Sequence, residues 1–319
     1  MNLIETRLVN YIKEKSQPNE IPGIGMGDDA AFLLLSSMEE SKLIVSTDSV
    51  VENVHFKREW GSYADVAIKL IERTSSDILA KGGHPHWALL NMNITGEFAK
   101  ETSLHRQFVD TFCEKLRQHK ISLVGGDVTR CAVNSFTMTV LGNASIFVRR
   151  KSDEIKTGDL LVIHGKIGGS SLALEVFQNG GIPEKELAAF YLRPEACWEN
   201  VWLKDLDARV SMDQSDSLME TLNTIAEENM IALTIHLEKI PLSVKMQEDE
   251  NTAGQILKSS EDLAILAILP GASQKKIVHY KDIAIIGEVT ETARKNISCF
   301  WNNHPVAMEK LHNEIYSHF

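Results

Sequence analysis

Helix and strand patterns alternate along the whole chain, and this alternation constrains the fold more than any other feature of the sequence. Apolar, β-branched segments at 42–46, 88–94 and 136–147 predict strands. Amphipathic segments between Ser62 and Gly82 and at 103–119 predict helices. Short connections join most of these elements, so the sequence predicts an α/β or α+β fold built in layers.

A charged stretch at 149–157 divides this alternation into two halves. After it the pattern begins again, with a strand at 160–164 and a helix at 170–178. The chain has 319 residues, which is enough for two domains of ordinary size. We therefore expect two αβ domains, 1–148 and 149–319.

The net charge and the cysteine content of the chain limit which partners it can bind and which cellular compartment it suits. The net charge of −11 argues against nucleic acid or an anionic membrane as the main partner, since both favour basic patches. Phosphate substrates stay compatible with this charge if metal ions supply the positive charge. The four cysteines show no CxxC spacing, and we see neither a signal peptide nor an apolar run near the roughly 20 residues that span a bilayer. We expect a cytoplasmic protein with reduced thiols.

Aspartates flanked by glycine, serine or threonine recur in six short segments, which we expect to be loops at the ends of strands and helices. Small neighbours let a ligand approach the backbone, and hydroxyls and carboxylates are the hard oxygen ligands that magnesium prefers. A turn or a helix cap explains each segment taken singly, whereas six together favour a metal and phosphate site. The segments are 27–29, 46–48, 75–77, 125–127, 213–216 and 259–262.

Among these aspartates, Asp77 gives the strongest individual argument for a bound cation. It lies near the C-terminal end of a predicted helix, where the macrodipole disfavours a carboxylate by roughly 0.3–1 kcal/mol. A nearby cation would remove that conflict, and a solvated surface acid is the alternative.

The common nucleotide-binding signatures are missing from the sequence. There is no G-x-x-x-x-G-K-[ST] loop and no H-R-D catalytic loop. The glycine-rich segment 164–170 could present N–H groups to an anion, although a structural turn is the simpler interpretation.

Three motifs in the first half carry a family resemblance. They read Gly-Met-Gly-Asp-Asp-Ala-Ala at 25–31, Ser-Thr-Asp-Ser-Val-Val-Glu-Asn-Val-His-Phe at 46–56 and Val-Gly-Gly-Asp-Val-Thr-Arg at 124–130. Together they resemble the thiamine-monophosphate kinases, which belong to the aminoimidazole-ribonucleotide-synthetase-like (PurM-like) superfamily of ATP-using enzymes. The resemblance covers nearly the whole chain, with further matches at 65–67, 76–77, 158–159, 212–216, 240–242, 261–262 and 286–290.

The resemblance implies an activity and an architecture. The activity is ATP-dependent phosphorylation of thiamine monophosphate to thiamine diphosphate by magnesium-assisted in-line transfer. No catalytic residue beyond the metal ligands is implied, because a phosphate monoester is already an anionic nucleophile. The architecture is a PurM-like N-terminal domain (1–148), which binds ATP and magnesium and forms a barrel with its copy in a homodimer. A PurM-like C-terminal domain (149–319) would contribute to ATP and substrate binding.

By position, the resemblance also implies three sets of site residues. Contacts to ATP would come from Gly126, Asp127, Ser215 and an arginine, for which Arg150 is the candidate and Arg149 the alternative. His55 and Glu261 would lie on the thiamine phosphate side. The magnesium ligands would be Asp29, Ser46, Thr47, Asp48, Asp77, Asp127, Asp213 and Asp216.

Two segments depart from the family pattern. The family's Ser-Asp-Gly reads Ser215-Asp216-Ser217 here, and its Gly-Gly-Glu-Asp reads Ser259-Ser260-Glu261-Asp262. If those glycines serve a left-handed backbone or the close approach of a ligand, serine carries a steric penalty in either case. The family's aromatic residue on the thiamine ring has no clear counterpart, with Trp301 and Tyr316 as candidates.

Three rival interpretations stay open. The chain could be a related superfamily enzyme that uses ATP on another substrate, or a nucleotide-binding module that has lost catalysis. His84 and His86 could form a transition-metal site, for which an ordered turn around Pro85 is the alternative.

Overall fold

The computed structural model describes residues 3–15, 23–24, 32–33, 42–245 and 252–306. The chain forms two compact units, and the main division falls between Ile146 and Phe147, two residues before the boundary expected from the sequence. Two short segments depart from a simple division into halves. The first unit comprises Met1–Leu79, Gly83–Ile146 and Leu192–Pro194, and the second comprises Ala80–Gly82, Phe147–Tyr191 and Glu195–Phe319.

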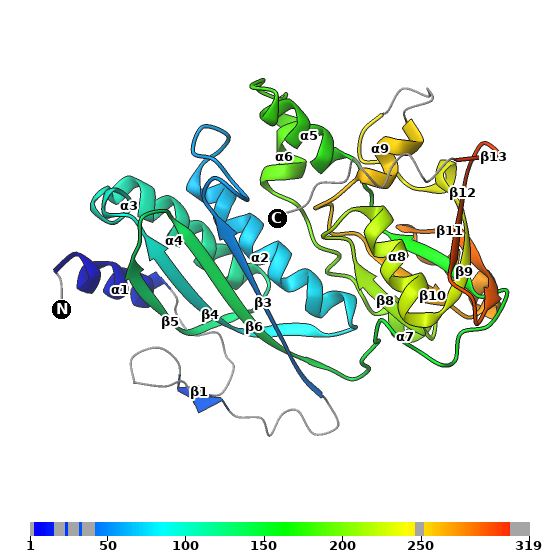
Figure 1. The fold of residues 1–319 in the computed structure, drawn as a ribbon. Helices are drawn as coiled ribbons and strands as arrows, with labels where there is room; N and C mark the ends of the chain where they lie inside the picture. Colours follow the sequence, from blue (N-terminus) through cyan, green and yellow to red (C-terminus); the bar gives the residue numbers. More distant parts are fainter. Residues whose placement is uncertain (1–2, 16–22, 25–31, 34–41, 246–251, 307–319) are drawn as a thin grey trace. The chain divides into compact units, whose positions relative to one another are not determined.

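The first unit contains a four-stranded sheet with the strand order β3-β6-β4-β5 (Figure 1). The β3–β6 and β6–β4 pairs are antiparallel, and the β4–β5 pair is parallel. The strands are β3 (Lys42–Val51), β4 (His84–Ile94), β5 (Ser122–Arg130) and β6 (Ser135–Ala144), and a separate pair is formed by β1 (Gly23–Ile24) and β2 (Phe32–Leu33).

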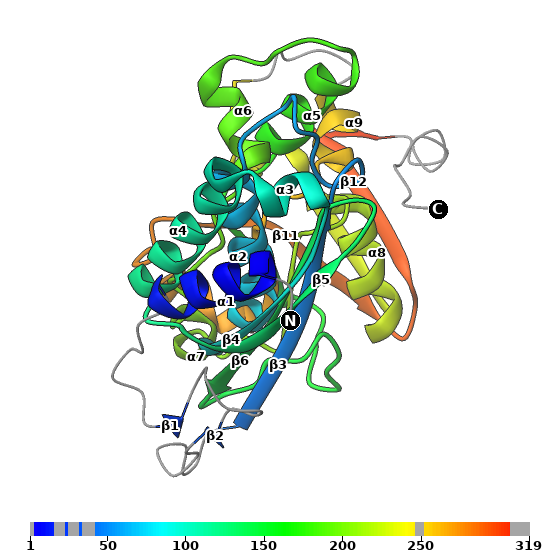
Figure 2. The ribbon, with the colours of Figure 1, turned by 90° about the vertical axis from the view of Figure 1, so that its left-hand side faces the viewer.

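Helices cover one face of this sheet (Figures 1 and 2). Alternate residues of β6 are buried, among them Phe136 and Met138, as strand periodicity requires when one face packs on helices. On the opposite face Leu43 and Val45 are exposed. The helices are α1 (Leu3–Lys15), α2 (Tyr63–Ala80), α3 (Gly96–Lys100) and α4 (Thr102–Gln118).

The first turn of α2 forms as the sequence predicts. The Asp65 N–H donates to Ser62 Oγ over 3.3 Å, and the Ser62 N–H donates to Asp65 Oδ2 over 2.7 Å. Asp65 also forms an ion pair with Arg193, so the crossing segment Leu192–Pro194 is held on the first unit by a charge at the start of α2.

Three of the six aspartate segments expected as loops lie inside regular elements instead. Residues 46–48 are in β3, 75–77 are in α2 and 125–127 are in β5. Pairing with β6 stabilises the polar part of β3, because Thr47 Oγ1 lies 3.0 Å from Thr139 Oγ1. The expectation of loops was wrong for 46–48 and 125–127, because strand pairing outweighs the turn preference of serine and aspartate. Residues 75–77 lie in the helix that the sequence predicts between Ser62 and Gly82.

The second unit contains a seven-stranded sheet with the order β13-β12-β9-β11-β7-β10-β8. Its pairs are antiparallel except for β12 with β9, which is parallel. The strands are β7 (Leu160–His164), β8 (Val210–Asp213), β9 (Ile231–His236), β10 (Ile265–Leu269), β11 (Ile283–Thr292), β12 (Asn296–Trp301) and β13 (His304–Pro305).

Helices α8 and α9 bury their apolar faces in the core of this unit. Leu222 and Ile225 of α8 and Ile256 of α9 are fully buried with strand residues such as Leu266. The helices are α5 (Gly169–Gln178), α6 (Lys185–Leu192), α7 (Trp202–Asp205), α8 (Leu218–Asn229), α9 (Thr252–Lys258) and α10 (Gln274–Ile277), with single 3-10 turns η2 (Leu237–Lys239) and η3 (Gly271–Ser273). In the described part of the chain, no helix combines the length and apolar character that crossing a membrane demands. The mixed α and β composition of both units confirms the predicted fold class.

Candidate functional site

Strand β3 and helix α2 bring three predicted magnesium ligands together in the first unit. Ser46 and Asp48 are two residues apart on β3, so their side chains share a face. Arg73 and Asp77 are four residues apart on α2 and also share a face. Ser46 Oγ donates a hydrogen bond to the Asp77 carboxylate, and Arg73 NH2 lies 4.0 Å from Asp48 Oδ1. Regular periodicity therefore aligns one hydroxyl and two carboxylates along the β3–α2 contact.

This group of oxygen atoms suits magnesium, which needs few protein ligands. It suits less well a metal that side chains alone would coordinate. Within residues 3–15, 23–24, 32–33, 42–245 and 252–306, no three His, Cys, Asp or Glu side chains gather as a metal site. Magnesium commonly binds through one or two carboxylates and completes its shell with phosphate oxygens and water. Asp77 lies in the last turn of α2, which contains no basic residue. A cation bound there would interact favourably with the negative end of the helix dipole.

Gly126 on β5 occupies a position that only glycine fits. Its φ is +152°, and an added Cβ would lie 1.8 Å from the carbonyl oxygen of Leu90. Asp127 follows on the exposed part of β5, where its carboxylate accepts a hydrogen bond of 2.9 Å from Thr129 Oγ1. The glycine thus allows β5 to pair closely with β4 next to a candidate ligand.

Within one chain, the sheet separates Asp127 from the Ser46, Asp48 and Asp77 group. Asp48 pairs with Met138, Met138 with Leu90, and Leu90 with Gly126, so β3 and β5 lie at opposite edges. Three spacings between strands amount to about 14 Å. The pairing also places Thr47 and Asp127 on the open face and Asp48 on the face that the helices cover.

His55 lies in the turn that follows β3. The Val51 N–H donates to His55 Nδ1 over 3.1 Å, so Nδ1 is an acceptor and a neutral ring carries its proton on Nε2. Lys69 Nζ donates to the His55 carbonyl oxygen over 3.3 Å. This arrangement fixes the tautomer of the neutral ring and puts its N–H donor at Nε2.

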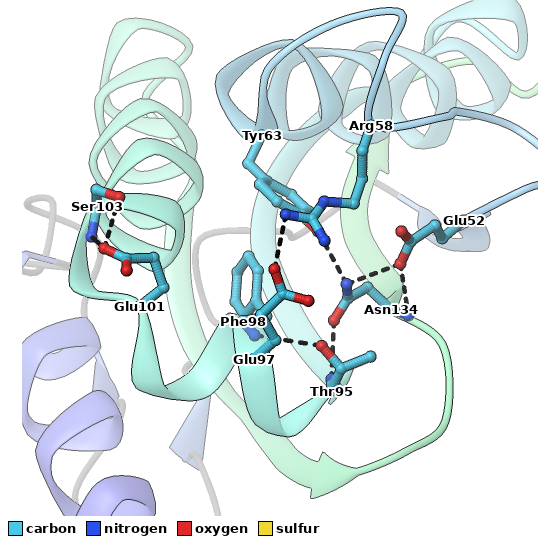
Figure 3. A network of polar contacts seen from close by, with 9 residues as sticks. All are labelled: Glu52, Arg58, Tyr63, Thr95, Glu97, Phe98, Glu101, Ser103 and Asn134. Atoms are coloured by element: carbon cyan, nitrogen blue, oxygen red, sulfur yellow. Dashed lines mark hydrogen bonds and ion pairs between the residues drawn. The ribbon is translucent and has the colours of Figure 1, made fainter.

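A buried polar network holds the start of that turn (Figure 3). The Asn134 amide is almost fully buried. Its Nδ2 donates to Glu52 Oε2 and to the Tyr63 hydroxyl, each over 2.8 Å. Its Oδ1 accepts a hydrogen bond from the Thr95 N–H. Burial, together with the Glu52 carboxylate, raises the pKa of Tyr63 to about 12, so the phenol stays protonated. The end of β3 is thereby tied to β4, β6 and α2.

In the second unit, the segments around Ser215 and Glu261 join into one structure. The Glu261 N–H donates to the Ser215 carbonyl oxygen over 3.0 Å, and the Leu218 N–H donates to the Ser259 carbonyl oxygen over 2.9 Å. Asp213 ends β8 immediately before this pairing. The predicted ligands of the second unit therefore lie at the end of β8 and on two adjoining loops: Asp213 on the strand, Ser215 and Asp216 on the first loop, and Glu261 on the second.

Asp262 closes the N-terminal end of α5. Its carboxylate accepts the N–H groups of Gly168 and Ser170 over 3.0 and 3.1 Å and the Ser259 hydroxyl over 3.1 Å. Burial raises the pKa of Asp262 to about 6, against the opposing effect of these hydrogen bonds. Within the glycine-rich segment 164–170, two N–H groups donate to the Asp262 carboxylate, and the Gly169 N–H donates to Ser243 Oγ over 2.8 Å. These internal partners favour its interpretation as a structural turn.

The serines that replace family glycines do not adopt a left-handed backbone. Ser217 has φ −61° and ψ 148°, and it caps α8 in a reciprocal capping box with Glu220. Near the second altered segment the left-handed residues are Glu261, at φ 60°, and Leu263, at φ 57°. A left-handed backbone at the serines was therefore wrong, because serine at these positions keeps an ordinary backbone. A penalty from close approach of a ligand stays a prediction.

Several other predicted residues do not join either group. Arg150 Nε pairs with Glu228 Oε1 at 3.1 Å, near the C-terminal end of α8, whereas Asp216 precedes its N-terminal end. Twelve helical residues separate these ends by about 18 Å, so the structure does not bring Arg150 to Ser215. The Arg149 carbonyl oxygen accepts from the Ser211 N–H over 3.2 Å, beside β8.

The remaining candidates lie elsewhere. Asp29 and Tyr316 lie outside the described residues. Trp301 packs partly buried against the core of the second unit. His84 and His86 belong to β4, so the ordered turn was wrong, and His86 Nε2 contacts Asn143 Oδ1 at 2.8 Å.

Comparison with known proteins gives one consistent result. The family model described as AIR synthase related protein, N-terminal domain, matches residues 27–144. The chain is 30% identical over 311 residues to a thiamine-monophosphate kinase of Leptospira interrogans, and this match covers 95% of the chain and 97% of the relative.

Solved structures show the same fold. A thiamine-monophosphate kinase from Stenotrophomonas maltophilia superimposes with a TM-score of 0.80 at 22% identity, covering 94% of this chain and 96% of that one. The structure of AaThiL complexed with AMPPCP and TMP superimposes with a TM-score of 0.70 at 25% identity, covering 96% of each chain. The aspartate motifs, the two αβ units and a relative that is 30% identical along 97% of its length agree, and the chain belongs to the thiamine-monophosphate kinase family.

Proposed function

We propose that this protein transfers a phosphoryl group from ATP to thiamine monophosphate and forms thiamine diphosphate. The observation that carries the proposal is the alignment of Ser46, Asp48 and Asp77 along the β3–α2 contact, within the motifs that resemble the family. The relative from Leptospira interrogans has this name, and the AaThiL structure contains TMP and AMPPCP, an ATP analogue.

The residues of the chain suit a transfer between two polyanions. Magnesium ions, when bound, would neutralise and orient the phosphates. In the first unit Ser46, Asp48 and Asp77 would hold a magnesium ion, with Asp29 as a further proposed ligand. His55 Nε2–H would donate to the acceptor phosphate, which is already anionic and requires no strong general base.

The second unit would supply the remaining contacts. Asp213 and Asp216 are proposed magnesium ligands, and Ser215 a contact to ATP. The Glu261 carboxylate is suited to the positively charged thiamine. Arg149 and Arg150 both stay candidates for the arginine at ATP. Measuring the KM for ATP in Arg149→Ala and Arg150→Ala decides between them, and the pairing of Arg150 with Glu228 favours the larger increase in Arg149→Ala.

A homodimer is part of the proposal. Asp127 and Gly126 lie on the edge strand β5, about 14 Å from Asp48 across the sheet, so one ion cannot join Asp48 and Asp127 of the same chain. The open face of the sheet exposes Leu43 and Val45, as a surface that a second copy covers would. We therefore assign Asp127 of one chain, together with Thr47 and Asp48 of the other, to a site that two chains complete.

Subunit complementation tests this assignment. Asp48→Ala and Asp127→Ala are each expected to be inactive. Unfolding and refolding them together gives mixed dimers with one intact site, so about a quarter of wild-type activity should return. No recovery in mixtures shown to contain mixed dimers would contradict a shared site.

A cytoplasmic location completes the proposal. The four cysteines are free, and a reducing compartment would keep such thiols reduced.

One assay separates the proposed function from its rivals. ADP release is measured with magnesium and ATP, first with thiamine monophosphate and then with a panel of other acceptors. We expect turnover with thiamine monophosphate that Asp48→Ala abolishes and that Asp205→Ala, a control at an exposed carboxylate bonded to Tyr280, leaves intact. Turnover only with another acceptor indicates a related enzyme, and ATP binding without turnover indicates a module that has lost catalysis.

A further inference from the structure

Gln214 stands between two candidate ligands but directs its own side chain into the protein. The residue is fully buried, immediately after Asp213. Its Nε2 donates two hydrogen bonds, to the Asp216 carbonyl oxygen over 2.8 Å and to the Ser259 carbonyl oxygen over 2.5 Å. Its Oε1 accepts no hydrogen bond among the described residues, so this amide acts through its two donors.

Those two carbonyl groups belong to different loops. Asp216 lies in the loop after β8, and Ser259 lies 43 positions later, in the loop that follows α9. The backbone of Gln214 joins the same loops, since its N–H donates to the Ala264 carbonyl oxygen over 2.8 Å and its carbonyl oxygen accepts from the Leu263 N–H over 3.1 Å. Every donor of Gln214, on the backbone and on the side chain, thus serves these two loops.

The second loop also has a backbone that needs support. Glu261 and Leu263 both have a left-handed conformation, which is unfavourable for residues with a side chain. Residues in such conformations persist only where their surroundings hold them. The hydrogen bonds to Gln214 and Ser215 lie directly at these two residues.

We propose that Gln214 is a positioning residue that holds the loop of Ser215 and Asp216 and the loop of Glu261 as one rigid body. The proposal rests on the proposed function for the ligands of each loop: ATP and magnesium for the first, thiamine phosphate for the second. It assigns to Gln214 no contact with either substrate. Its amide couples the placement of the two ligand-binding loops.

The kinetic test uses the full-length protein and Gln214→Met, which keeps the length of the side chain and removes both donors. Ser273→Ala is the matched control in the same unit, because it removes one buried hydrogen bond, of 2.9 Å to the Leu206 carbonyl oxygen, away from both loops. All variants are assayed well below their melting temperatures. We expect the KM values for ATP and for thiamine monophosphate to rise together by about 10-fold in Gln214→Met and to stay within about 2-fold in the control.

A second readout does not require turnover. Hydrogen exchange of the peptide that spans residues 259–264 reports the Glu261 and Leu263 amides, which are bonded to the other loop. We expect exchange to accelerate about 10-fold in Gln214→Met and not in Ser273→Ala. If Gln214→Met does not fold, Gln214→Asn takes its place, because its shorter side chain keeps the amide but cannot reach both carbonyl groups.

Unchanged exchange in the Gln214 variant would overturn the proposal. So would a fall in melting temperature with both KM values unchanged, since that pattern indicates a purely structural role. An inactive wild-type protein would instead contradict the proposed function, and the exchange measurement would still decide whether Gln214 couples the loops.

Discussion

The two units hold their candidate ligands in different ways. In the first unit, Ser46 and Asp48 lie on a strand and Asp77 on a helix, so ordinary periodicity sets the direction of each side chain. In the second unit, Ser215 and Glu261 lie on loops that buried side chains hold together. A site on regular elements depends on a few fixed positions, whereas a site on loops tolerates other residues as long as its hydrogen bonds persist.

The largest expected effect tests whether the stability of the first unit depends on the backbone conformation at Gly126. Gly126→Ala should destabilise the protein by about 3 kcal/mol or more, because its Cβ would meet the Leu90 carbonyl oxygen at 1.8 Å. Gly125→Ala is the control one residue away, where the nearest atom is the flexible end of Leu89 at 3.1 Å, and it should cost less than about 1 kcal/mol. Urea unfolding measures both, and equal losses would show that Gly126 is not specially constrained.

The next effect concerns charge at the end of α2. Asp77→Asn should lower turnover by more than about 100-fold, because it removes a negative ligand while the hydrogen bond from Ser46 can persist. Without magnesium the same variant should be more stable than wild type by roughly 0.3–1 kcal/mol, since the helix dipole no longer opposes a carboxylate. Melting temperatures with EDTA and with magnesium check this reversal. A wild type that magnesium does not stabilise would contradict a metal at Asp77.

A smaller, pH-dependent effect is expected at Asp262 in the second unit. The pKa of this carboxyl is 3.8 in its unperturbed form and about 6 when folded, because the side chain is buried. Between these values the folded state binds more protons than the unfolded state, so the contribution of Asp262 to stability falls as pH rises. Asp262→Asn does not titrate, and the free energy of unfolding of wild type should therefore decrease relative to this variant from pH 4 to pH 6. A constant difference across this range would show that the carboxyl is not perturbed.

The smallest effects test whether the second unit tolerates its altered residues. Ser217→Ala should cost about 1 kcal/mol, because it removes the cap of α8, and Ser217→Gly, which restores the family residue, should cost only a few tenths. Both variants should keep KM and kcat within about 2-fold, since the capping hydrogen bonds lie within the helix start. Thermal unfolding and steady-state assays measure these changes. A large kinetic gain in Ser217→Gly would show that serine impairs the site.

Much of the first unit could be predicted from the sequence. The capping residues Ser62 and Asp65 predicted the start of α2, and the motifs around Asp48 and Asp77 indicated the candidate ligands that the structure places along one contact. Local chemistry was sufficient there, because a helix cap and side-chain periodicity act over a few residues. The polar residues of β3 misled the prediction of loops, since a strand gains its stability from a partner that lies far away in the sequence.

The buried polar residues could not be assigned in the same way. Each of these residues forms a hydrogen bond with a group far away in the sequence. Asn134 bonds to Thr95, 39 positions away, Gln214 to Ser259, 45 positions away, and Asp262 to Gly168, 94 positions away. The sequence gives only a weak indication of the role of Gln214. An uncharged glutamine lies between two aspartates that are candidate ligands, which suggests a role other than direct binding. Their partners become visible only when distant loops meet.

The sequence alone determined the alternation that makes two αβ units, the aspartate motifs and the family they resemble. It did so because periodicity, capping and motif spacing are local properties. Tertiary structure decided that Asp127 and Asp48 lie at opposite edges of one sheet, that α5 is closed by Asp262, and that Gln214 joins two loops. These outcomes depend on strand order and on hydrogen bonds between distant segments, which no local pattern encodes.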